Sequence, residues 1–412
     1  MLFQRHLRER VERLLQMMPA VFLQGARQVG KTTLAKRLIE AGILNDYVNL
    51  DDPLIASAVQ QDVIGFVRSL SKGTVIDEVQ RIPALLPAIK MRIDERRETG
   101  TFLLTGSANP LALPQIADAL VGRVGLATLM PLSQGEIEGV RETWLERIFE
   151  EEPSIAIYPR VDDLPERLIR GGYPEAVLRT DPDSRREWLI AYLDTLIARD
   201  VRALAEVERL TALPSLLKLL AAAPCQILNI TNLSRELGIA QPTLQKYLSL
   251  FEALFIVVRV PAWYANIGTR LLKSPKILLS DTGLAAALVA VSTQRMQQEP
   301  LLFGRMLENF VGMELLKQIQ FAGARVQLHH FRTDKGMEVD FVLENETGQL
   351  VGVEVKAGAT PNAGDFRGLR VLQQATGERF ARGILFYWGE RSLPFGERLW
   401  AMPISALWSP PL

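Results

Sequence analysis

The stretch AVFLQGARQVGKTTLAKRLIE, residues 20–40, decides the fold of the N-terminal part of this chain. A short apolar run leads into the pattern GxxxxGKT, and apolar residues at helical spacing follow. Gly25 and Gly30 let the backbone curl without Cβ clashes, so successive N–H groups can converge on phosphate oxygens at the positive end of a helix. The order strand, glycine loop, helix therefore predicts a phosphate-binding loop. A chance glycine turn is the alternative, and the flanking patterns count against it.

The residues of this loop have distinct expected roles. Lys31 is expected to reach the β- and γ-phosphates of a nucleotide, and the hydroxyl of Thr32 is expected to bind Mg²⁺. The predicted nucleotide-binding residues run without a gap along the loop: Gly25, Ala26, Arg27, Gln28, Val29, Gly30, Lys31, Thr32 and Thr33. A nucleoside triphosphate and Mg²⁺ are therefore the expected ligands.

A second stretch, GTVIDEVQ at residues 73–80, reads as a buried strand that ends in two adjacent carboxylates. Asp77 is expected to hold the Mg²⁺ shell, and Glu78 to polarise the water that attacks the γ-phosphate. The alternative is a solvated turn. The distance from the glycine loop leaves room for an intervening strand and helix, which favours the functional interpretation.

A third apolar run, TFLLTGSA at residues 101–108, ends in small hydroxyl residues. Thr105 and Ser107 are candidates to sense the γ-phosphate or to hold the attacking water. Arg123 follows on a turn and is a candidate to stabilise transition-state charge in its own or a neighbouring subunit. A surface ion pair of little energetic value is the plainer interpretation of Arg123.

Several motifs together carry a family resemblance. GARQVGKTTL, VIDEVQ, LLTGSA, LVGRV and PLSQGE resemble the AAA-type ATPases of bacteria and archaea, which implies ATP as the nucleotide and ATP hydrolysis as the activity. GGYPEAV, YLDTLIARDV and SDTGLAAAL further downstream resemble the large family that joins this ATPase to a C-terminal domain of unknown function. The resemblance implies that Arg199 faces the nucleotide or a neighbour, whereas an ion pair with Asp200 within one helix is the plainer interpretation.

Residues 227–252, ILNITNLSRELGIAQPTLQKYLSLFE, read as a helix-turn-helix with a first helix over 232–237, a turn at Gly238 and a second helix from Gln241. The next stretch alternates like two strands and carries aromatic and basic residues between them, as a winged helix does: Trp263, Tyr264, Arg270, Lys273 and Lys276. Only Lys246 is positive on the second helix, and phosphate contacts dominate affinity for DNA. DNA binding and protein packing therefore both stay open.

The stretch MEVDFVLENETGQLVGVEVKAG, residues 337–358, predicts a two-stranded hairpin. Alternation sends Glu354 and Lys356 to one face. Asp340 on the paired strand is then expected to meet Glu354 around one Mg²⁺, with Lys356 orienting a water and Glu308 on an upstream helix completing the acid cluster. The pattern resembles the restriction-endonuclease-type nucleases, although Val339 stands where proline is usual. A solvated charge pair on an open hairpin is the alternative.

Length and composition predict two or three domains, because 412 residues is too long for one small core. The expected divisions are 1–160 for the ATPase, 161–295 for a helical and winged-helix region, and 296–412 for the restriction-endonuclease-like domain. A single cysteine, Cys225, and three histidines exclude an intramolecular disulfide and make a zinc site unexpected, which favours the cytosol. No apolar run approaches the roughly 18–20 residues that span a bilayer, so no membrane partner is expected.

The sequence thus predicts an α/β chain: an AAA-type P-loop parallel-sheet domain, a helical and winged-helix middle, and a C-terminal α/β restriction-endonuclease-like domain. The leading functional hypothesis is a Mg²⁺-dependent ATPase that acts on DNA. With Lys+Arg 47 and Asp+Glu 47, the net charge is +0, and this balance favours the alternative of a nucleotide-dependent regulatory scaffold that binds protein partners. Homo-oligomerisation, and with it an arginine acting across an interface, stays open.

Overall fold

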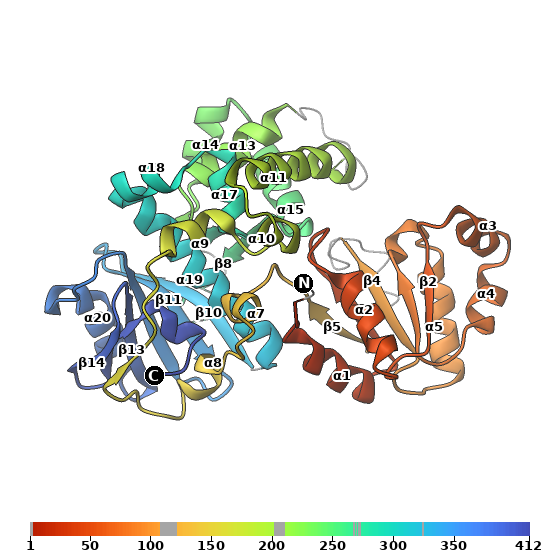
Figure 1. The fold of residues 1–412 in the computed structure, drawn as a ribbon, viewed down its shortest axis with the longest axis horizontal. Helices are drawn as coiled ribbons and strands as arrows, with labels where there is room; N and C mark the ends of the chain where they lie inside the picture. The colour runs from red at the N-terminus through yellow and green to blue at the C-terminus, as the bar shows by residue number, and fades with distance from the viewer. Residues whose placement is uncertain are drawn as a thin grey trace. The chain divides into compact units, whose positions relative to one another are not determined.

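The computed structural model describes residues 3–107, 122–201, 211–266, 268, 270, 273–323 and 325–412. The chain divides into two compact units. The nucleotide unit comprises residues 4–131 and the short segment 252–255, and the output unit comprises residues 132–251 and 256–412. Figure 1 draws the first of these in red to orange and the second in yellow to blue.

The nucleotide unit is built on a five-stranded sheet in which every neighbouring pair is parallel. The strand order is β2-β3-β4-β1-β5, with β1 at Ala20–Gln24, β2 at Asp46–Asn49, β3 at Thr74–Asp77, β4 at Phe102–Gly106 and β5 at Val124–Thr128. The residues of β1, β3 and β4 are all buried, as expected for a parallel sheet covered on both faces. The predicted parallel-sheet P-loop architecture is confirmed.

Helices accompany this sheet at every connection that the structure describes. They are α1 Leu7–Met17, α2 Lys31–Glu40, α3 Pro53–Gln61, α4 Val63–Ser69 and α5 Leu85–Glu95. The side chains of Asp52 and Asp62 cap α3 and α4 by accepting backbone N–H bonds from Leu54 and Gly65. An apolar cluster that includes Phe22, Ile76 and Leu104 packs β1, β3 and β4 together.

The output unit contains a seven-stranded mixed sheet in the order β10-β11-β12-β13-β15-β14-β6. The strands are β6 Ala156–Ile157, β10 Val326–Arg332, β11 Glu338–Asn345, β12 Leu350–Lys356, β13 Phe380–Tyr387, β14 Arg391–Gly396 and β15 Leu399–Pro403. Strands β10, β11 and β12 are antiparallel, whereas β12 pairs parallel with β13 after a crossover through α20, Arg367–Thr376. The long helix α19, Pro300–Ala322, packs against β10 and β12 and against β9, Lys276–Leu279, a strand of a second sheet.

Helices dominate the described residues 164–201 and 211–251 of the output unit. Besides α19 and α20, the described α-helices after residue 131 are α7 Gln134–Glu138, α8 Trp144–Arg147, α9 Leu164–Arg170, α10 Pro174–Leu178, α11 Pro182–Leu196, α13 Ala212–Ala222, α14 Ile230–Leu237, α15 Gln241–Ala253, α17 Thr282–Leu288 and α18 Thr293–Gln298. A π-helical turn, Ile197–Val201, follows α11. A three-stranded antiparallel sheet, β7-β9-β8, accompanies them, with β7 at Gln226–Ile227, β8 at Val257–Val260 and β9 at Lys276–Leu279.

The predicted helix-turn-helix forms as α14 and α15. Helix α14 begins two residues earlier than expected because the side chain of Asn229 caps it, accepting from the N–H of Asn232 at 3.0 Å. Gly238 ends the helix in the left-handed conformation, with φ of 63°. The hairpin predicted at the C-terminus forms as β11 and β12.

Within the described ranges, no helix combines the length and the apolar character that a bilayer crossing requires.

Candidate functional site

The glycine loop between β1 and α2 has the backbone that its sequence demands. Gly25 has φ of +150° and Gly30 has φ of +100°, a region that L side chains rarely adopt. A Cβ on Gly25 would stand 2.1 Å from the carbonyl oxygen of Leu129, so the loop passes directly against the segment that follows β5. The loop therefore leads the chain tightly into the positive N-terminal end of α2.

Lys31, the first residue of α2, is only 5% exposed and folds back over this loop. Its ammonium donates to the carbonyl oxygens of Gly25 at 2.9 Å and of Ala26 at 2.8 Å. Of the remaining loop residues, Gln28 has a left-handed φ of 62°, Arg27 is half-buried and Thr33 is exposed. The loop thus places a fixed cation and a curled backbone together, which is the arrangement that triphosphate binding needs.

Asp77, at the end of β3, is the point where four elements meet. Its Oδ2 accepts from the hydroxyl of Thr32 on α2 at 2.8 Å and from the phenol of Tyr47 on β2 at 2.5 Å. Its Oδ1 accepts from the hydroxyl of Thr105 on β4. A hydroxyl and a carboxylate in contact are oxygen donors of the kind that Mg²⁺ prefers, so Thr32 and Asp77 fit the expected metal.

Glu78 follows Asp77 in the left-handed conformation, with φ of 60°, and its carboxylate faces a separate set of partners. The side-chain amide of Gln80 donates to it, and the hydroxyl of Ser107 lies 3.4 Å from it. The backbone N–H of Glu78 donates to Thr105 at 3.1 Å. Because Thr105 also bonds Asp77, the end of β4 contacts both the carboxylate of Asp77 and the backbone of Glu78. A role of Thr105 or Ser107 in sensing the γ-phosphate or holding the water stays a prediction.

Three contributors were missed from the sequence. Tyr47 belongs to no motif, and the parallel register of β2 with β3 is what brings it to Asp77. Gln80 lies in the motif VIDEVQ, but no role was expected for it. Arg5, which precedes α1, donates to the carbonyl oxygens of Val29 at 2.5 Å and of Met130 at 2.6 Å. Such contacts arise from tertiary packing, so no local sequence signal marks them.

Arg123 forms a bidentate pair with Asp94 on α5, with distances of 2.7 Å and 3.0 Å. Arg199 lies exposed on the π-helical turn. The side chain of Asp200, the strand end at Ala108 and the first two residues of the LVGRV motif, 120–121, lie outside the described residues. The role of either arginine in catalysis stays a prediction.

The C-terminal acids predicted from the hairpin also converge. Asp340 on β11 accepts from the N–H of Val355 at 2.8 Å, and Glu354 on β12 is buried beside it. Burial, the neighbouring charge of Asp340 and a hydrogen bond between the two acids raise the pKa of Glu354 well above its ordinary value. Lys356 lies half-buried on the same face of β12.

A cation from another part of the chain lies among these acids. The ammonium of Lys276, on β9, is 2.5 Å from Oε1 of Glu308 and 3.8 Å from Oδ1 of Asp340. Burial and the charge of Asp340 raise the pKa of Glu308 to about 7. Across the described residues, no group of three or more His, Cys, Asp or Glu side chains is arranged to hold a metal ion. A divalent cation held by Glu308, Asp340 and Glu354 stays a prediction.

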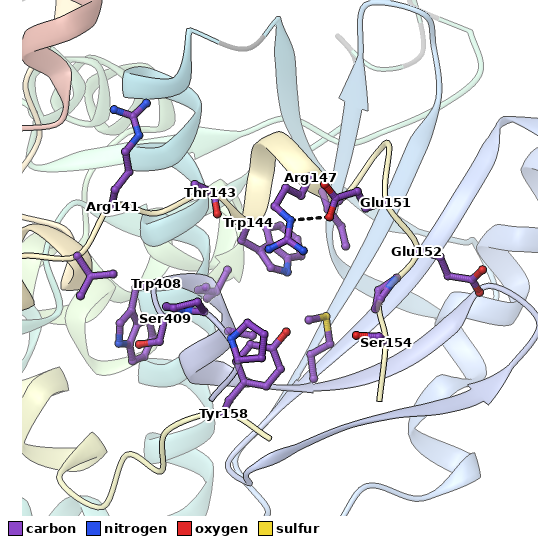
Figure 2. A pocket seen from close by; sticks show the side chains of 18 residues that line it. Arg141, Thr143, Trp144, Arg147, Glu151, Glu152, Ser154, Tyr158, Trp408 and Ser409 are labelled. Atoms are coloured by element: carbon purple, nitrogen blue, oxygen red, sulfur yellow. Dashed lines mark hydrogen bonds and ion pairs between the residues drawn. The ribbon is translucent and has the colours of Figure 1, made fainter. Parts of the chain in front are cut away.

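A cavity of about 330 Å³ lies in the output unit and is lined mainly by α8, the segment 151–158 and the end of the chain. Figure 2 shows Trp144, Tyr158 and Trp408 around it, with the ion pair of Arg147 and Glu151 at its side. None of the predicted nucleotide or acid-cluster residues lines this cavity.

Comparison with known proteins finds three family matches along the chain. Residues 18–138 match the family described as AAA domain, residues 161–295 match a domain of unknown function (DUF8612), and residues 303–407 match a domain of unknown function (DUF4143). The first match spans the glycine loop, Asp77, Glu78 and Thr105, which are the residues that the structure brings together.

Similar whole chains are found in a bacterium and an archaeon. Uncharacterized protein Rv2008c of Mycobacterium tuberculosis is 28% identical over 395 residues, covering 96% of this chain and 82% of that one. Uncharacterized protein MJ1544 of Methanocaldococcus jannaschii is 24% identical over 345 residues, covering 80% and 73%. The Walker-type ATPase PABY2304 of Pyrococcus abyssi aligns with a TM-score of 0.44 at 15% identity, over 70% of this chain and 96% of that chain. Residues 18–138 thus match the AAA family, and the glycine loop, Asp77 and Glu78 within them have the arrangement of a P-loop nucleotide site.

Proposed function

We propose that the nucleotide unit hydrolyses ATP with Mg²⁺ and that nucleotide state controls binding of DNA by the output unit. The observation that carries the first part is the convergence of Thr32, Asp77 and Glu78 at one edge of the sheet. Thr32 and Asp77 supply an oxygen pair for Mg²⁺, which neutralises phosphate charge when bound. The carboxylate of Glu78 accepts hydrogen bonds from Gln80 and Ser107 and not from Thr32, so it is available to orient a water and not a metal ion.

The chain's own residues divide the work. Lys31 and the loop backbone bind and orient the β- and γ-phosphates. Glu78 holds the attacking water and accepts its proton. Thr105 joins Asp77 to Glu78 through two hydrogen bonds, so a shift of β4 moves both acids together. This linkage gives the site a means of reporting whether the γ-phosphate is present.

The test of hydrolysis is the Glu78→Gln variant. This change keeps the side-chain shape but removes the proton acceptor, so turnover is expected to fall by about 10²- to 10⁴-fold while ATP binding persists. Glu95→Gln makes the same chemical change at the exposed end of α5 and is the matched control. Steady-state phosphate release and equilibrium binding of a fluorescent ATP analogue measure the two properties. Unchanged turnover in Glu78→Gln would overturn the proposal.

Support for the DNA part comes from a cation-lined hollow beside the helix-turn-helix. Its volume is about 790 Å³, and α14, α15, β8 and β10 contribute to its walls. Arg259, Lys273 and Arg332 supply positive charge, and Gln245 and Ser249 on α15 supply polar groups. We take α13, α14 and α15 with the sheet β7-β9-β8 as a winged helix, whose basic hollow is suited to the phosphate backbone.

Binding of a labelled DNA duplex across a salt series tests this surface. Arg259→Gln and Arg332→Gln are each expected to weaken binding and to reduce the slope of log K against log[salt] by about one for each DNA phosphate that the native arginine neutralises. Lys218→Gln removes one positive charge from the exposed part of α13 outside the hollow and serves as the control. Equal binding by all four proteins would exclude the hollow as the DNA surface.

The regulatory scaffold remains the second candidate, because positive and negative charges balance across the chain and α15 carries a single lysine, Lys246. The two candidates differ in whether DNA changes ATP turnover. Stimulation by duplex, single-stranded or branched DNA, absent in Glu78→Gln, supports the DNA function. A rate indifferent to every DNA form supports the scaffold. Measuring the molecular mass of the protein in solution, with and without ATP, shows whether it forms oligomers. Only in an oligomer could Arg123 or Arg199 act on the site of a neighbouring subunit.

We further propose the division 1–160, 161–295 and 296–412 for these activities, in which residues 132–160 are assigned to the ATPase although they pack within the output unit. Limited proteolysis with and without ATP tests it, since cleavage is expected near residues 160 and 295.

A further inference from the structure

Lys276 is the most deeply buried cation among the described residues that face the C-terminal acids. It lies on β9, is 1% exposed, and reaches between α19 and β11. Its ammonium donates to Oε1 of Glu308 at 2.5 Å and to the backbone carbonyl oxygen of Asp340 at 3.2 Å. It also forms an ion pair with Oε1 of Glu338 at 3.2 Å.

The surroundings hold this ammonium in its charged form. Burial alone would lower the pKa of Lys276, but the carboxylates of Glu308, Asp340 and Glu338 raise it well above the ordinary value. The thiol of Cys225 donates to Glu308 at 3.3 Å, which satisfies the same carboxylate oxygen from a second side. Lys276 is therefore a positive charge surrounded by three carboxylates.

This position is the one that a divalent cation would need. A metal held by Glu308 and Asp340 would bind their oxygens at about 2.0–2.1 Å for Mg²⁺. An ammonium only 2.5 Å from the same Glu308 oxygen would then lie within a few ångströms of the metal, and the two cations would repel in a site with little water to screen them. The ammonium and a metal ion would thus compete for the same oxygen of Glu308.

We propose that Lys276 is the resident cation of this acidic centre, so that the centre joins β9 to α19 and β11 and does not bind the divalent metal that nucleic-acid cleavage would require. The inference stands on the contacts of the output unit alone and does not depend on ATP hydrolysis. It assigns Glu308, Asp340 and Glu354 to an ion cluster inside the fold. In this cluster the ammonium of Lys276 takes the place that a metal ion has in an active nuclease.

Mn²⁺ binding to the full-length protein without nucleotide, followed by electron paramagnetic resonance, tests this directly. Asp340→Asn is expected to leave Mn²⁺ binding to the otherwise native chain unchanged, because no metal is held there. A loss of one bound Mn²⁺ in Asp340→Asn would overturn the proposal.

The Lys276→Met variant provides the positive arm, since methionine keeps an apolar stem and removes the charge. This variant is expected to gain one Mn²⁺ site with an affinity at least tenfold higher than that of any Mn²⁺ site in the native chain. The double variant Lys276→Met, Asp340→Asn is expected to lack this site. Lys273→Met, an exposed lysine three residues away, is the matched control. A folded Lys276→Met protein that gains no site would contradict the proposal. If that variant does not fold, the comparison of the native chain with Asp340→Asn decides alone.

Discussion

At the scale of single residues, Tyr47 illustrates how the nucleotide site depends on a side chain outside every motif. Its phenol donates to the same Asp77 oxygen that accepts from Thr32. Burial and the hydrogen bond to Asp77 raise the pKa of Tyr47 well above its ordinary value, so the phenol remains a donor at any physiological pH. Tyr47 thus positions the carboxylate that is expected to hold Mg²⁺.

Tyr47→Phe should therefore raise the Mg²⁺ concentration needed for half-maximal ATP turnover by about tenfold, the effect of losing a hydrogen bond to a charged group. ATPase assays across a Mg²⁺ series measure this. Tyr158→Phe, which removes a phenol from the output unit, should leave the Mg²⁺ requirement as it is in the native chain. A Mg²⁺ series identical for native chain and Tyr47→Phe would show that Tyr47 has no positioning role.

His329 and His330 on β10 make stability depend on pH. Burial, then the charge of Arg270, lowers the pKa of His329 to about 4, and burial, then the charge of Lys276, lowers that of His330 to about 4. The unfolded chain takes up these protons near pH 6.5, before the folded chain does, so stability is complete above pH 6.5 and is lost as pH falls towards 4.

The lowered pKa of each histidine should reduce the free energy of unfolding of the output unit by about 2 kcal/mol between pH 7 and pH 5. Thermal unfolding at the two pH values measures the loss, and His330→Gln should show a smaller pH dependence than the native chain because one titrating group is gone. His6→Gln changes a histidine that lies outside the output unit and should leave the difference unaltered. Equal pH dependence in native and His330→Gln proteins would contradict the assignment.

At the scale of elements, the β1–loop–α2 segment could be predicted because its signal is local. Gly25, Gly30, Lys31 and Thr32 are adjacent in sequence, and the structure keeps them adjacent in space. The same holds for the β11–β12 hairpin. The contact of Lys276 with Glu308 and Asp340 could not be predicted, because it joins residues 32 and 64 positions apart through packing of β9, α19 and β11. The sequence suggested Lys276 only as a basic residue of a wing.

Gly25→Ala tests the loop as an element. The added Cβ would stand 2.1 Å from the carbonyl oxygen of Leu129, at a φ that alanine rarely adopts, so the loop must shift. ATP affinity is expected to fall at least tenfold, measured with a fluorescent analogue. Gly358→Ala is the control, since no atom lies within 4 Å of its Cβ position and its φ is not positive. Native affinity in Gly25→Ala would contradict the close approach.

At the scale of the whole molecule, the division into two units predicts two separable unfolding transitions. Ligand that binds only one folded unit stabilises that unit alone, by about 2.7 kcal/mol at a hundredfold excess over the dissociation constant. ATP with Mg²⁺ should therefore raise one transition in calorimetry and leave the other in place. Lys31→Ala should abolish the shift. Equal displacement of both transitions would show that the units unfold together.

The segment 132–158 has a consequence for synthesis. Its backbone N–H groups at Gln134 and Leu145 donate to Glu314 and Gln318 on α19, and β6 pairs with β14 more than two hundred residues later. On the ribosome this segment emerges long before its partners, and at about 5–20 residues per second it waits on the order of ten seconds for α19 alone. All residues of the nucleotide unit have by then been synthesised, so the output unit is the last part of the new chain to fold.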